Sequence, residues 1–210
     1  MNYPIFEVIK DKSILTPVIK LVEYKGEKVI YKDYSNRPCW VKKGWGEILI
    51  NNEFSILQRL QGIKGIPHPI AKTSDGFIVE YINGKFLNKF QKDSIPYEII
   101  QRLDKLISEM HNRYVAHLDL AQRKNILITA DYTPYLIDFA NALYLRPNVL
   151  FSRKLFDYLC LIDKGSLLKF KNRYFPDKMT PDDKRFLKRF WAIRRWWFLN
   201  PKTFRPKDKV

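Results

Sequence analysis

The sequence predicts an α+β fold with two lobes: a small N-terminal lobe with an antiparallel sheet and one helix, and a reduced, mainly helical C-terminal lobe. Two patterns carry this prediction. Apolar and polar residues alternate over much of residues 5–82, as in strands, whereas apolar residues recur at helical spacing from Pro96 onward. A chain of 210 residues, 46% of them hydrophobic, can bury a core and enclose a cleft between two lobes.

The N-terminal part predicts three strands, one helix and two further strands, in that order. After the short apolar run FEVIK, the segment PVIKLVEYKGEKVIYKDYS alternates on both sides of Lys25-Gly26, which favours a hairpin. The segment GWGEILINNEFSILQRLQGI places its apolar residues at helical spacing. Two short runs joined at Ser74-Asp75-Gly76 then predict another pair of strands.

The C-terminal part predicts helices on either side of two short strands. Residues 97–115 have one apolar helical face, and two apolar runs follow around the turn at residues 130–134. From Arg153 the pattern is helical, with breaks near Pro176 and Pro181. We expect one domain overall, with an N-terminal lobe at residues 1–82 and a C-terminal lobe at 83–210 that ends in a basic aromatic tail from about residue 181.

Five polar residues stand in an order that suits phosphoryl transfer. That reaction needs a cation for the phosphates, a carboxylate for a metal ion and a group that orients the incoming hydroxyl. The candidates are Lys32 within a strand, Glu53 on the next helix, Asp119 in a loop, Asn125 before a strand and Asp138 at the end of an apolar strand. Each alone has an ordinary structural reading, such as an exposed lysine or a turn residue. Their common order argues against chance.

The segments around these residues resemble the protein-kinase-like superfamily. MHNRYVAHLDLAQRKNILI is similar to a kinase catalytic loop with its lead-in, and LIDFA is similar to the D-F-G metal site with Ala140 in place of glycine. The chain departs from the protein-kinase pattern at DKSILTP, which contains no glycine where a Gly-rich loop would fall. A second departure is the spacing, because Asn125 follows Asp119 by six positions instead of five.

The compact build is most similar to bacterial lipopolysaccharide-core kinases, which act on heptose or 3-deoxy-manno-octulosonic acid, and to RIO-type small atypical kinases. The resemblance to the former includes a helix that carries an aspartate, here Asp157, before basic and aromatic helices. The extra residue of the catalytic loop is expected within Leu120 to Lys124. The preceding helix fixes His117 and Asp119, and the following strand fixes Asn125.

The resemblance implies ATP and Mg²⁺ as cofactors and a role for each candidate. The implied roles are Lys32 on the α- and β-phosphates, Glu53 (with Glu47 as a weaker rival) paired to that lysine, Asp119 as the catalytic aspartate, Asn125 and Asp138 on Mg²⁺, the backbone of Glu80, Tyr81 and Ile82 on the adenine, and Arg123 or Lys124 facing the transferring phosphate.

The net charge of +16 is concentrated near the C-terminus, where residues 164–210 hold 15 basic and 4 acidic residues. Phe186, Phe190, Ile193 and Trp197 form a stripe among these cations, widened by Trp191 and Trp196. The stripe fits a core helix, a helix at an anionic membrane surface, or a surface for RNA. We find no secretory signal and no transmembrane run, and expect a cytoplasmic protein that can associate with the inner face of the cytoplasmic membrane.

The leading hypothesis from the sequence is an ATP- and Mg²⁺-dependent phosphotransferase that phosphorylates a hydroxyl of a membrane-associated glycolipid, such as the lipopolysaccharide inner core. The first alternative is a RIO-like small atypical protein serine kinase with a protein acceptor. The second alternative is a non-catalytic pseudokinase that binds RNA, the ribosome or a membrane through its basic tail. The absent Gly-rich loop and the extra residue of the catalytic loop motivate this last alternative. The sequence leaves the acceptor and the oligomeric state open.

Overall fold

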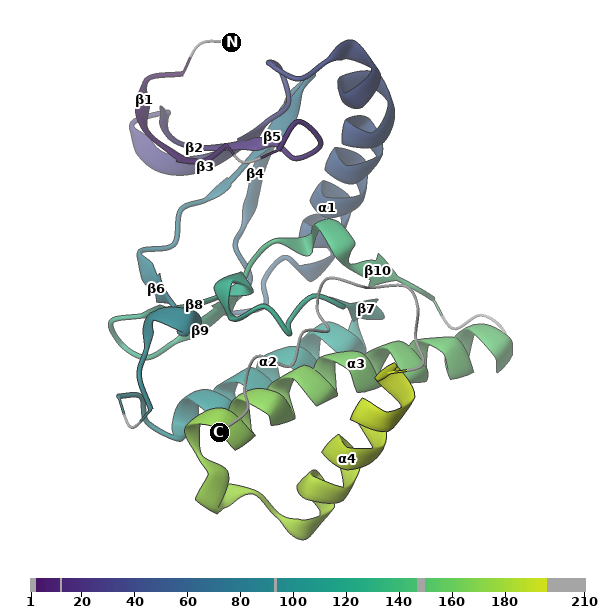
Figure 1. Ribbon diagram of the computed structural model, residues 1–210. Coiled ribbons are helices and arrows are strands. Elements are labelled where there is room, and N and C mark those ends of the chain that lie inside the picture. The colour runs from purple at the N-terminus through teal and green to yellow at the C-terminus, as the bar shows by residue number, and fades with distance from the viewer. Residues whose placement is uncertain (1–2, 12, 93, 147–149, 196–210) are drawn as a thin grey trace.

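A computed structural model describes residues 3–11, 13–92, 94–146 and 150–195. Its two lobes confirm the predicted α+β class: a five-stranded antiparallel sheet with helix α1 forms the small lobe, and helices α2, α3 and α4 dominate the large one (Figure 1). The order of three strands, a helix and two strands in the small lobe is as predicted.

The small-lobe sheet has the strand order β1-β2-β3-β5-β4. Its elements are β1 (Ile5–Lys10), β2 (Val18–Tyr24), β3 (Glu27–Asp33), β4 (Pro69–Lys72) and β5 (Gly76–Glu80), with α1 (Glu47–Leu60) between β3 and β4 after a π-helical turn (Val41–Gly46). Lys25 and Gly26 join β2 to β3 with φ angles of 54° and 82°. Two positive φ angles are typical of the tight hairpin turn that matches strand twist.

The two faces of this sheet have different surroundings. On the inner face, Phe77 of β5 meets Phe54 of α1 with ring centroids 5.8 Å apart. On the outer face, Val29, Tyr31 and Ile78 belong to a small separate cluster. Because side chains alternate along a strand, neighbouring residues of β3 serve the two faces in turn.

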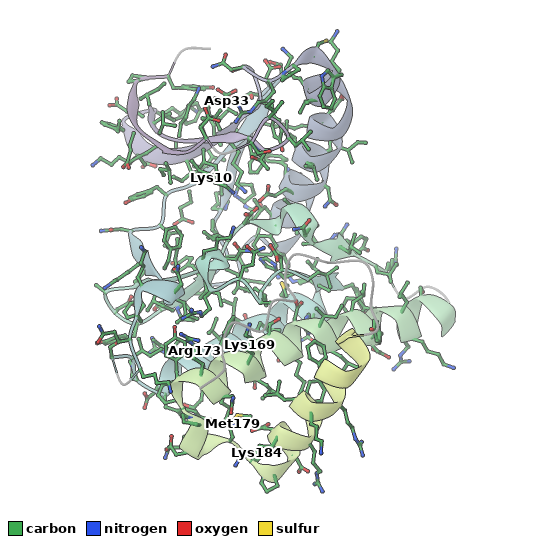
Figure 2. All side chains as sticks on the ribbon, in the orientation of Figure 1. Lys10, Asp33, Lys169, Arg173, Met179 and Lys184 are labelled. Atoms are coloured by element: carbon green, nitrogen blue, oxygen red, sulfur yellow. The ribbon has the colours of Figure 1, made fainter. Side chains whose placement is uncertain are left out.

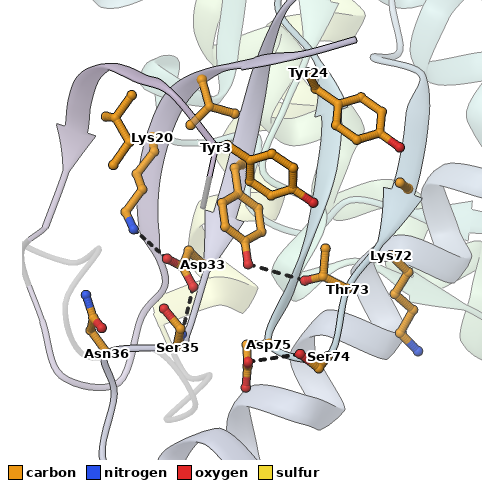
Figure 3. A pocket seen from close by; sticks show the side chains of 14 residues that line it. Tyr3, Lys20, Tyr24, Asp33, Ser35, Asn36, Lys72, Thr73, Ser74 and Asp75 are labelled. Carbon is orange, nitrogen blue, oxygen red and sulfur yellow. Dashed lines mark hydrogen bonds and ion pairs between the residues drawn. The ribbon is translucent and has the colours of Figure 1, made fainter. Parts of the chain in front are cut away.

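A cavity of about 600 Å³ lies on the outer face, and Figure 3 shows its lining. Lys20 pairs with Asp33 there at 2.5 Å, and the Tyr31 hydroxyl lies 3.3 Å from that of Thr73. None of the site residues predicted from the sequence lines this cavity. This cavity is therefore not the candidate active site, which lies on the opposite face of the same sheet.

The large lobe combines three long helices with short strands. Its elements are β6 (Gly84–Phe86), the 3-10 turn η2 (Leu87–Lys89), α2 (Glu98–Asn112), β7 (Val115–Ala116), η3 (Arg123–Asn125), β8 (Ile126–Thr129), β9 (Pro134–Leu136), η4 (Phe139–Asn141), β10 (Leu143–Tyr144), α3 (Leu150–Tyr174), η5 (Pro176–Lys178) and α4 (Pro181–Arg195). Strands β8 and β9 are the predicted pair; β6 extends their sheet, and β7 pairs with β10. The sequence analysis missed β6, β7 and β10, which are two or three residues long and have no pattern of their own.

One buried apolar cluster joins the two lobes. It runs from Leu60 of α1 through Leu103 and Met110 of α2 to Phe170 of α3, all of them at most 1% exposed. The apolar face predicted for α2 therefore points into the core. This shared core fixes α1, and with it the small-lobe sheet, against the large lobe.

Helix α4 packs on α3 through part of its predicted aromatic stripe. Leu187 is buried against Leu168 and Met179, and Phe186 stacks on Phe190 with ring centroids 5.9 Å apart. The core reading therefore holds for this side of the helix. The side chains of Trp191 and Ile193, and all of Trp196 and Trp197, lie outside what the structure describes. Within the described ranges, no helix combines the length and apolarity that a membrane span requires.

Two glycines after α1 allow a direct test of the small-to-large-lobe contact. A Cβ on Gly65 (φ +99°) would lie 2.7 Å from the Pro134 carbonyl oxygen, whereas a Cβ on Gly62 (φ +87°) would meet nothing within 4 Å. We expect Gly62→Ala to cost about 1 kcal/mol, from backbone strain alone. Gly65→Ala should cost at least about 2 kcal/mol more, because the clash adds to the strain. Urea unfolding of both variants measures the difference, and equal losses would contradict the close approach.

Candidate active site

A buried ion pair joins the small-lobe sheet to α1. Lys32 on β3 places its Nζ 2.6 Å from Glu53 Oε1, and the two residues are only 8% and 4% exposed. The rival Glu47 is exposed at the first position of α1. The structure thus places Glu53, in the middle of the helix, beside the lysine, as the sequence analysis predicted.

Asp138 completes a group of three charges. Its Oδ1 lies 3.5 Å from Lys32 Nζ. Burial alone would lower the pKa of Lys32, but attraction to Glu53 and then Asp138 outweighs burial and raises that pKa. Lys32 in turn lowers the pKa of Asp138, against the opposing effect of burial. The site therefore holds a permanent ammonium beside a carboxylate that stays ionised at neutral pH.

Glu53 also connects the lobes through the backbone after Asp138. Burial raises the pKa of Glu53, while Lys32 and a backbone hydrogen bond oppose that rise. The bond comes from the N–H of Phe139, which donates to Glu53 Oε1 at 2.9 Å. Asn52 adds a second link, because its Nδ2 donates to the Ala142 carbonyl at 3.0 Å. The segment that carries Asp138 is thus bonded to the small lobe's only long helix within the described chain.

Asp138 has a left-handed backbone, with φ 66° and ψ 66°, directly before the 3-10 turn η4. This conformation costs a non-glycine residue about 1–2 kcal/mol. Strain of this kind persists where surrounding contacts over-determine it, and it gathers at functional sites. Here Phe139 is fully buried on one side, and the Ile137 N–H donates to the Asn125 carbonyl at 2.9 Å on the other. These contacts hold the backbone on both sides of Asp138 and bring the strand that precedes it alongside Asn125.

Asp119 and Asn125 contact each other despite their spacing. Asn125 Nδ2 donates to both the carbonyl and Oδ2 of Asp119, each at 3.1 Å, and Gln122 also donates to Oδ2. Two successive turns shorten the path, since the Gln122 N–H bonds to Asp119 O and the Asn125 N–H bonds to Gln122 O. The extra residue is accommodated in these turns, within the predicted Leu120–Lys124 interval.

The catalytic-loop backbone is held by Asp163 of α3, which the sequence analysis missed. Its carboxylate accepts the N–H of His117 at 2.8 Å, the N–H of Leu118 at 2.9 Å and His111 Nε2 at 3.0 Å. The helix aspartate named from the sequence, Asp157, is exposed instead. The position of Asp163 in the largely apolar segment CLIDKGSLL could have indicated its burial. A fully buried carboxylate needs hydrogen-bond donors around it, which points to a structural role for Asp163.

His117 lies between the catalytic loop and Asp138. Its Nε2 donates to the Ile137 carbonyl at 3.1 Å, and its ring is 4.7 Å from that of Phe139. This hydrogen bond places the proton on Nε2. Nδ1 is buried and has no partner among the described residues. The ring thus ties the loop before Asp119 to the strand before Asp138.

The other predicted site residues lie at different distances from this centre. Arg123 does not reach the charged group: its Nη1 donates to the Tyr174 hydroxyl at 2.8 Å, and that hydroxyl donates to Leu87 O. Lys124 is exposed, with no hydrogen bond or ion pair in the described chain. The expectation that one of these two cations faces the centre therefore receives no support. Arg123 instead donates to Tyr174, the last residue of α3 in the large lobe.

The segment predicted for adenine connects the lobes. Glu80 ends β5, its N–H is already bonded to the His68 carbonyl at 2.9 Å, and its carboxylate accepts the His68 N–H at 3.0 Å. Tyr81 is half-buried and Ile82 is buried, between β5 and β6. The Glu80 N–H is therefore taken, which leaves the backbone of Tyr81 and Ile82 for a ligand.

A divalent cation fits the donors of this centre. Asp138 supplies a carboxylate, and the Asn125 amide has its Nδ2 on Asp119, which turns its Oδ1 away from that carboxylate. Mg²⁺ prefers oxygen ligands and commonly takes one or two from a protein, with waters and phosphate oxygens completing its shell. Among the described residues, no group of three or more His, Cys, Asp or Glu side chains is placed to hold a metal. Asp138 and Asn125 are thus the residues that would hold the ion.

Asp163 offers a test of how the catalytic loop is positioned. In Asp163→Asn, an NH₂ group would replace one oxygen and face an N–H donor. We expect a loss of about 2–4 kcal/mol in the free energy of unfolding. The matched control, Asp157→Asn on the exposed face of α3, should stay within about 0.5 kcal/mol of the parent chain. Chemical denaturation compares the two, and a small loss for Asp163→Asn would mean that its three bonds add little.

Comparison with known proteins finds the likeness in structure alone. No family model matches the chain, and no curated protein matches its sequence. The Rio2 kinase–ADP/Mg²⁺–phosphoaspartate complex from Chaetomium thermophilum is similar, with a TM-score of 0.62 and 20% identity over 89% of this chain and 61% of that one. The Rio2 kinase crystal structure from the same organism gives a TM-score of 0.58 and 20% identity over 82% and 59%.

The chain thus spans about three fifths of the length of these two kinases. Both likenesses extend over more than four fifths of this chain. Identity at this level is informative about fold and leaves activity to be argued from the site. The chain therefore has a two-lobed protein-kinase-like fold, similar to that of the RIO-type atypical kinases.

Proposed function

We propose that the chain is an ATP- and Mg²⁺-dependent phosphotransferase that acts on a protein hydroxyl, as a RIO-like small atypical kinase. The observation that carries the proposal is the buried pair of Lys32 and Glu53, with the half-buried Asp138 against Lys32, beside the Asp119–Asn125 contact. The similar Rio2 complex contains ADP and Mg²⁺, which agrees with the chemistry that these side chains suit.

Each side chain has a task in this proposal. Lys32, oriented by Glu53, binds phosphate oxygens and neutralises their charge. Asp138 and Asn125 would hold Mg²⁺, which would supply positive charge for the phosphates during transfer. Asp119, oriented by Asn125 and Gln122, accepts a hydrogen bond from the incoming hydroxyl and aligns it. The turns around Gln122 keep Asp119 near the metal ligands despite the longer loop.

The electrostatics favour a working site over a non-catalytic relic. Removing the Lys32 ammonium and the Glu53 carboxylate from water costs free energy that their attraction offsets only in part. Structures bear such a cost where the group has a task, and perturbed ionisable groups gather at functional sites. The left-handed backbone of Asp138 adds a further local cost at the same point. A chain that merely bound RNA or a membrane through its tail would gain nothing from this arrangement.

Two classes of acceptor, a protein and a glycolipid, have to be distinguished. The structural likeness to RIO-type kinases favours a protein acceptor, and nothing in the comparisons favours the lipopolysaccharide core. One observation keeps an anionic acceptor as the second candidate: Lys184, Arg185, Lys188 and Arg189 are all exposed on α4. Such a row of cations attracts phosphorylated lipids as well as acidic protein segments.

Labelled ATP tests the activity and the acceptor together. The chain is incubated with Mg²⁺ and either a basic or acidic model protein or purified lipopolysaccharide core. We expect label on protein, and we expect Asp119→Asn to lower the rate at least about 100-fold while Mg·ATP binding persists. Label on the lipopolysaccharide instead would move the acceptor to the second candidate. Equal transfer by Asp119→Asn and the parent chain would reject the assignment of Asp119.

The neighbouring Rio2 complex contains a phosphoaspartate, so label on the chain itself needs a chemical check. Hydroxylamine cleaves an aspartyl phosphate and leaves a serine phosphate intact. We expect hydroxylamine-stable label on the acceptor protein. Label that stays on the chain and is released by hydroxylamine would identify an ATPase that phosphorylates its own aspartate instead of an acceptor.

The placement of Asn125 can be tested against its neighbour Lys124. Asn125→Ala removes a proposed metal ligand and the amide that orients Asp119, so we expect phosphotransfer to fall at least about tenfold. Lys124→Ala removes an exposed side chain without contacts and should leave the rate within about twofold. Initial rates at increasing Mg²⁺ measure both effects. The reverse ranking would mean that the extra loop residue is misplaced.

A further inference from the structure

The register of the small-lobe sheet brings a second lysine to the cleft. Lys10, the last residue of β1, lies opposite Ile19 of β2, and Ile19 lies opposite Lys32 of β3. Directly opposed residues of antiparallel strands point to the same face. Lys10 and Lys32 therefore share the inner face, two strands and about 10 Å apart at their Cα atoms. In Figure 2, Lys10 lies at the edge of the sheet that faces the large lobe.

A β-bulge produces this placement. Val8 opposes Lys20, which belongs to the outer face with Asp33, and the pairing then shifts so that Lys10 opposes Ile19. The shift inserts one extra residue, Ile9, between the two pairs. In an unbroken ladder Ile9 would take the inner position and Lys10 would point to the outer face. Bulges commonly re-aim a side chain in this way.

The ammonium of Lys10 is available to a ligand. Within the described chain it has no hydrogen bond and no ion pair, and the residue is half-buried. An unpaired cation on the same sheet face as Lys32 is well placed for an anion bound between the two lysines.

The connection from β1 to β2 does not offer the usual glycine-rich cover. Residues 11–17 contain no glycine. Arg37 binds both ends of this connection: its Nη2 contacts Asp11 Oδ1 at 2.6 Å, and its Nε donates to the Thr16 carbonyl at 2.9 Å. Charge on the phosphates of a bound nucleotide therefore needs a partner other than a flexible glycine backbone. Arg123 is half-buried, and its guanidinium already donates to the Tyr174 hydroxyl.

We propose that Lys10 is a second phosphate-binding cation, which clamps the polyphosphate of a nucleoside triphosphate against Lys32 and Asp138 in place of a Gly-rich loop. This inference rests on the proposed phosphotransferase function and names the residue that holds the outer phosphates. The two ammoniums approach from β1 and β3, on one face of the sheet with β2 between them, so a chain of phosphates can bridge them. Adenosine, which has no phosphate, does not use Lys10.

Titration calorimetry of the full chain with Mg·ATP, Mg·ADP and adenosine tests the clamp. Lys10→Met removes the charge and keeps an unbranched side chain. We expect it to weaken Mg·ATP binding about tenfold, the size of one charge-assisted hydrogen bond, and to leave adenosine binding unchanged. Lys10→Arg should bind Mg·ATP nearly as the parent chain does, and Lys10→Glu should bind it more weakly than Lys10→Met.

Lys28→Met is the matched control. Lys28 is an exposed lysine on the same inner face of β3, four residues and about 13 Å along the strand from Lys32. Lys28→Met changes the net charge by the same amount as Lys10→Met, so it measures any effect of overall charge on binding. We expect nucleotide binding by Lys28→Met to equal that of the parent chain, and all variants to melt at the parent temperature without ligand.

The outcomes separate this inference from the function on which it rests. If the parent chain binds Mg·ATP and Lys10→Met binds it equally well, the clamp is rejected and the phosphotransferase proposal stands. If the parent chain binds no nucleotide, both are rejected. An equal weakening for adenosine and Mg·ATP, or the same loss in Lys28→Met, also rejects a phosphate contact. If Lys10→Met melts at a lower temperature than the parent chain, Lys10→Arg and Lys10→Glu are compared instead. Tighter Mg·ATP binding by Lys10→Arg than by Lys10→Glu then supports the clamp, and equal or reversed affinities reject it.

Discussion

The contact on which the rest of the site depends is the Glu53 carboxylate. One of its oxygens receives the ammonium of Lys32 from the sheet and the N–H of Phe139 from the large lobe. A single buried acceptor thus fixes the distance between the strand that carries the cation and the turn that carries Asp138. Burial makes this dependence strong, because a low-dielectric setting penalises any unpaired member of the group. The shared apolar core beneath α1 holds the helix in place and so stabilises the contact.

A second framework, in the large lobe, positions the catalytic loop without touching the reacting region. Asp163 collects three donors from the end of α2 and from the residues before Asp119, while His117 bridges to the strand before Asp138. The positive φ of Leu118 is tolerated because its N–H is bonded to the same carboxylate. The helices thus supply rigidity, and the chemistry rests on residues at strand ends and turns, the division of labour expected of a site carried on a rigid scaffold.

Local sequence pattern predicted the elements that have a pattern of their own. The alternation around Lys25-Gly26, the helical spacing of residues 47–60 and the apolar run before Asp138 each encode a local structure, and the order of Lys32, Glu53 and Asp138 followed from them. Asp163 was missed because the donors that satisfy it lie about 50 residues away in the sequence, so the apolar run around it marks its burial but not its partners. Lys10 was missed because a bulge reverses the face that simple alternation gives it. The short strands β6, β7 and β10 exist only through their partners.

Because side chains alternate between the two faces of β3, the site also depends on the pairing register of this strand. Lys32 points into the cleft, while Tyr31 and Asp33 line the cavity behind it, so the two sites share a wall one strand thick. A slip of β3 by one residue would exchange the two sets, turning Lys32 outward and Asp33 inward. The cleft would then present an acid where phosphate needs a cation, and Glu53 would face a like charge. Under the proposed function, a chain with this slip would bind nucleotide poorly, so nucleotide affinity would report the register of β3.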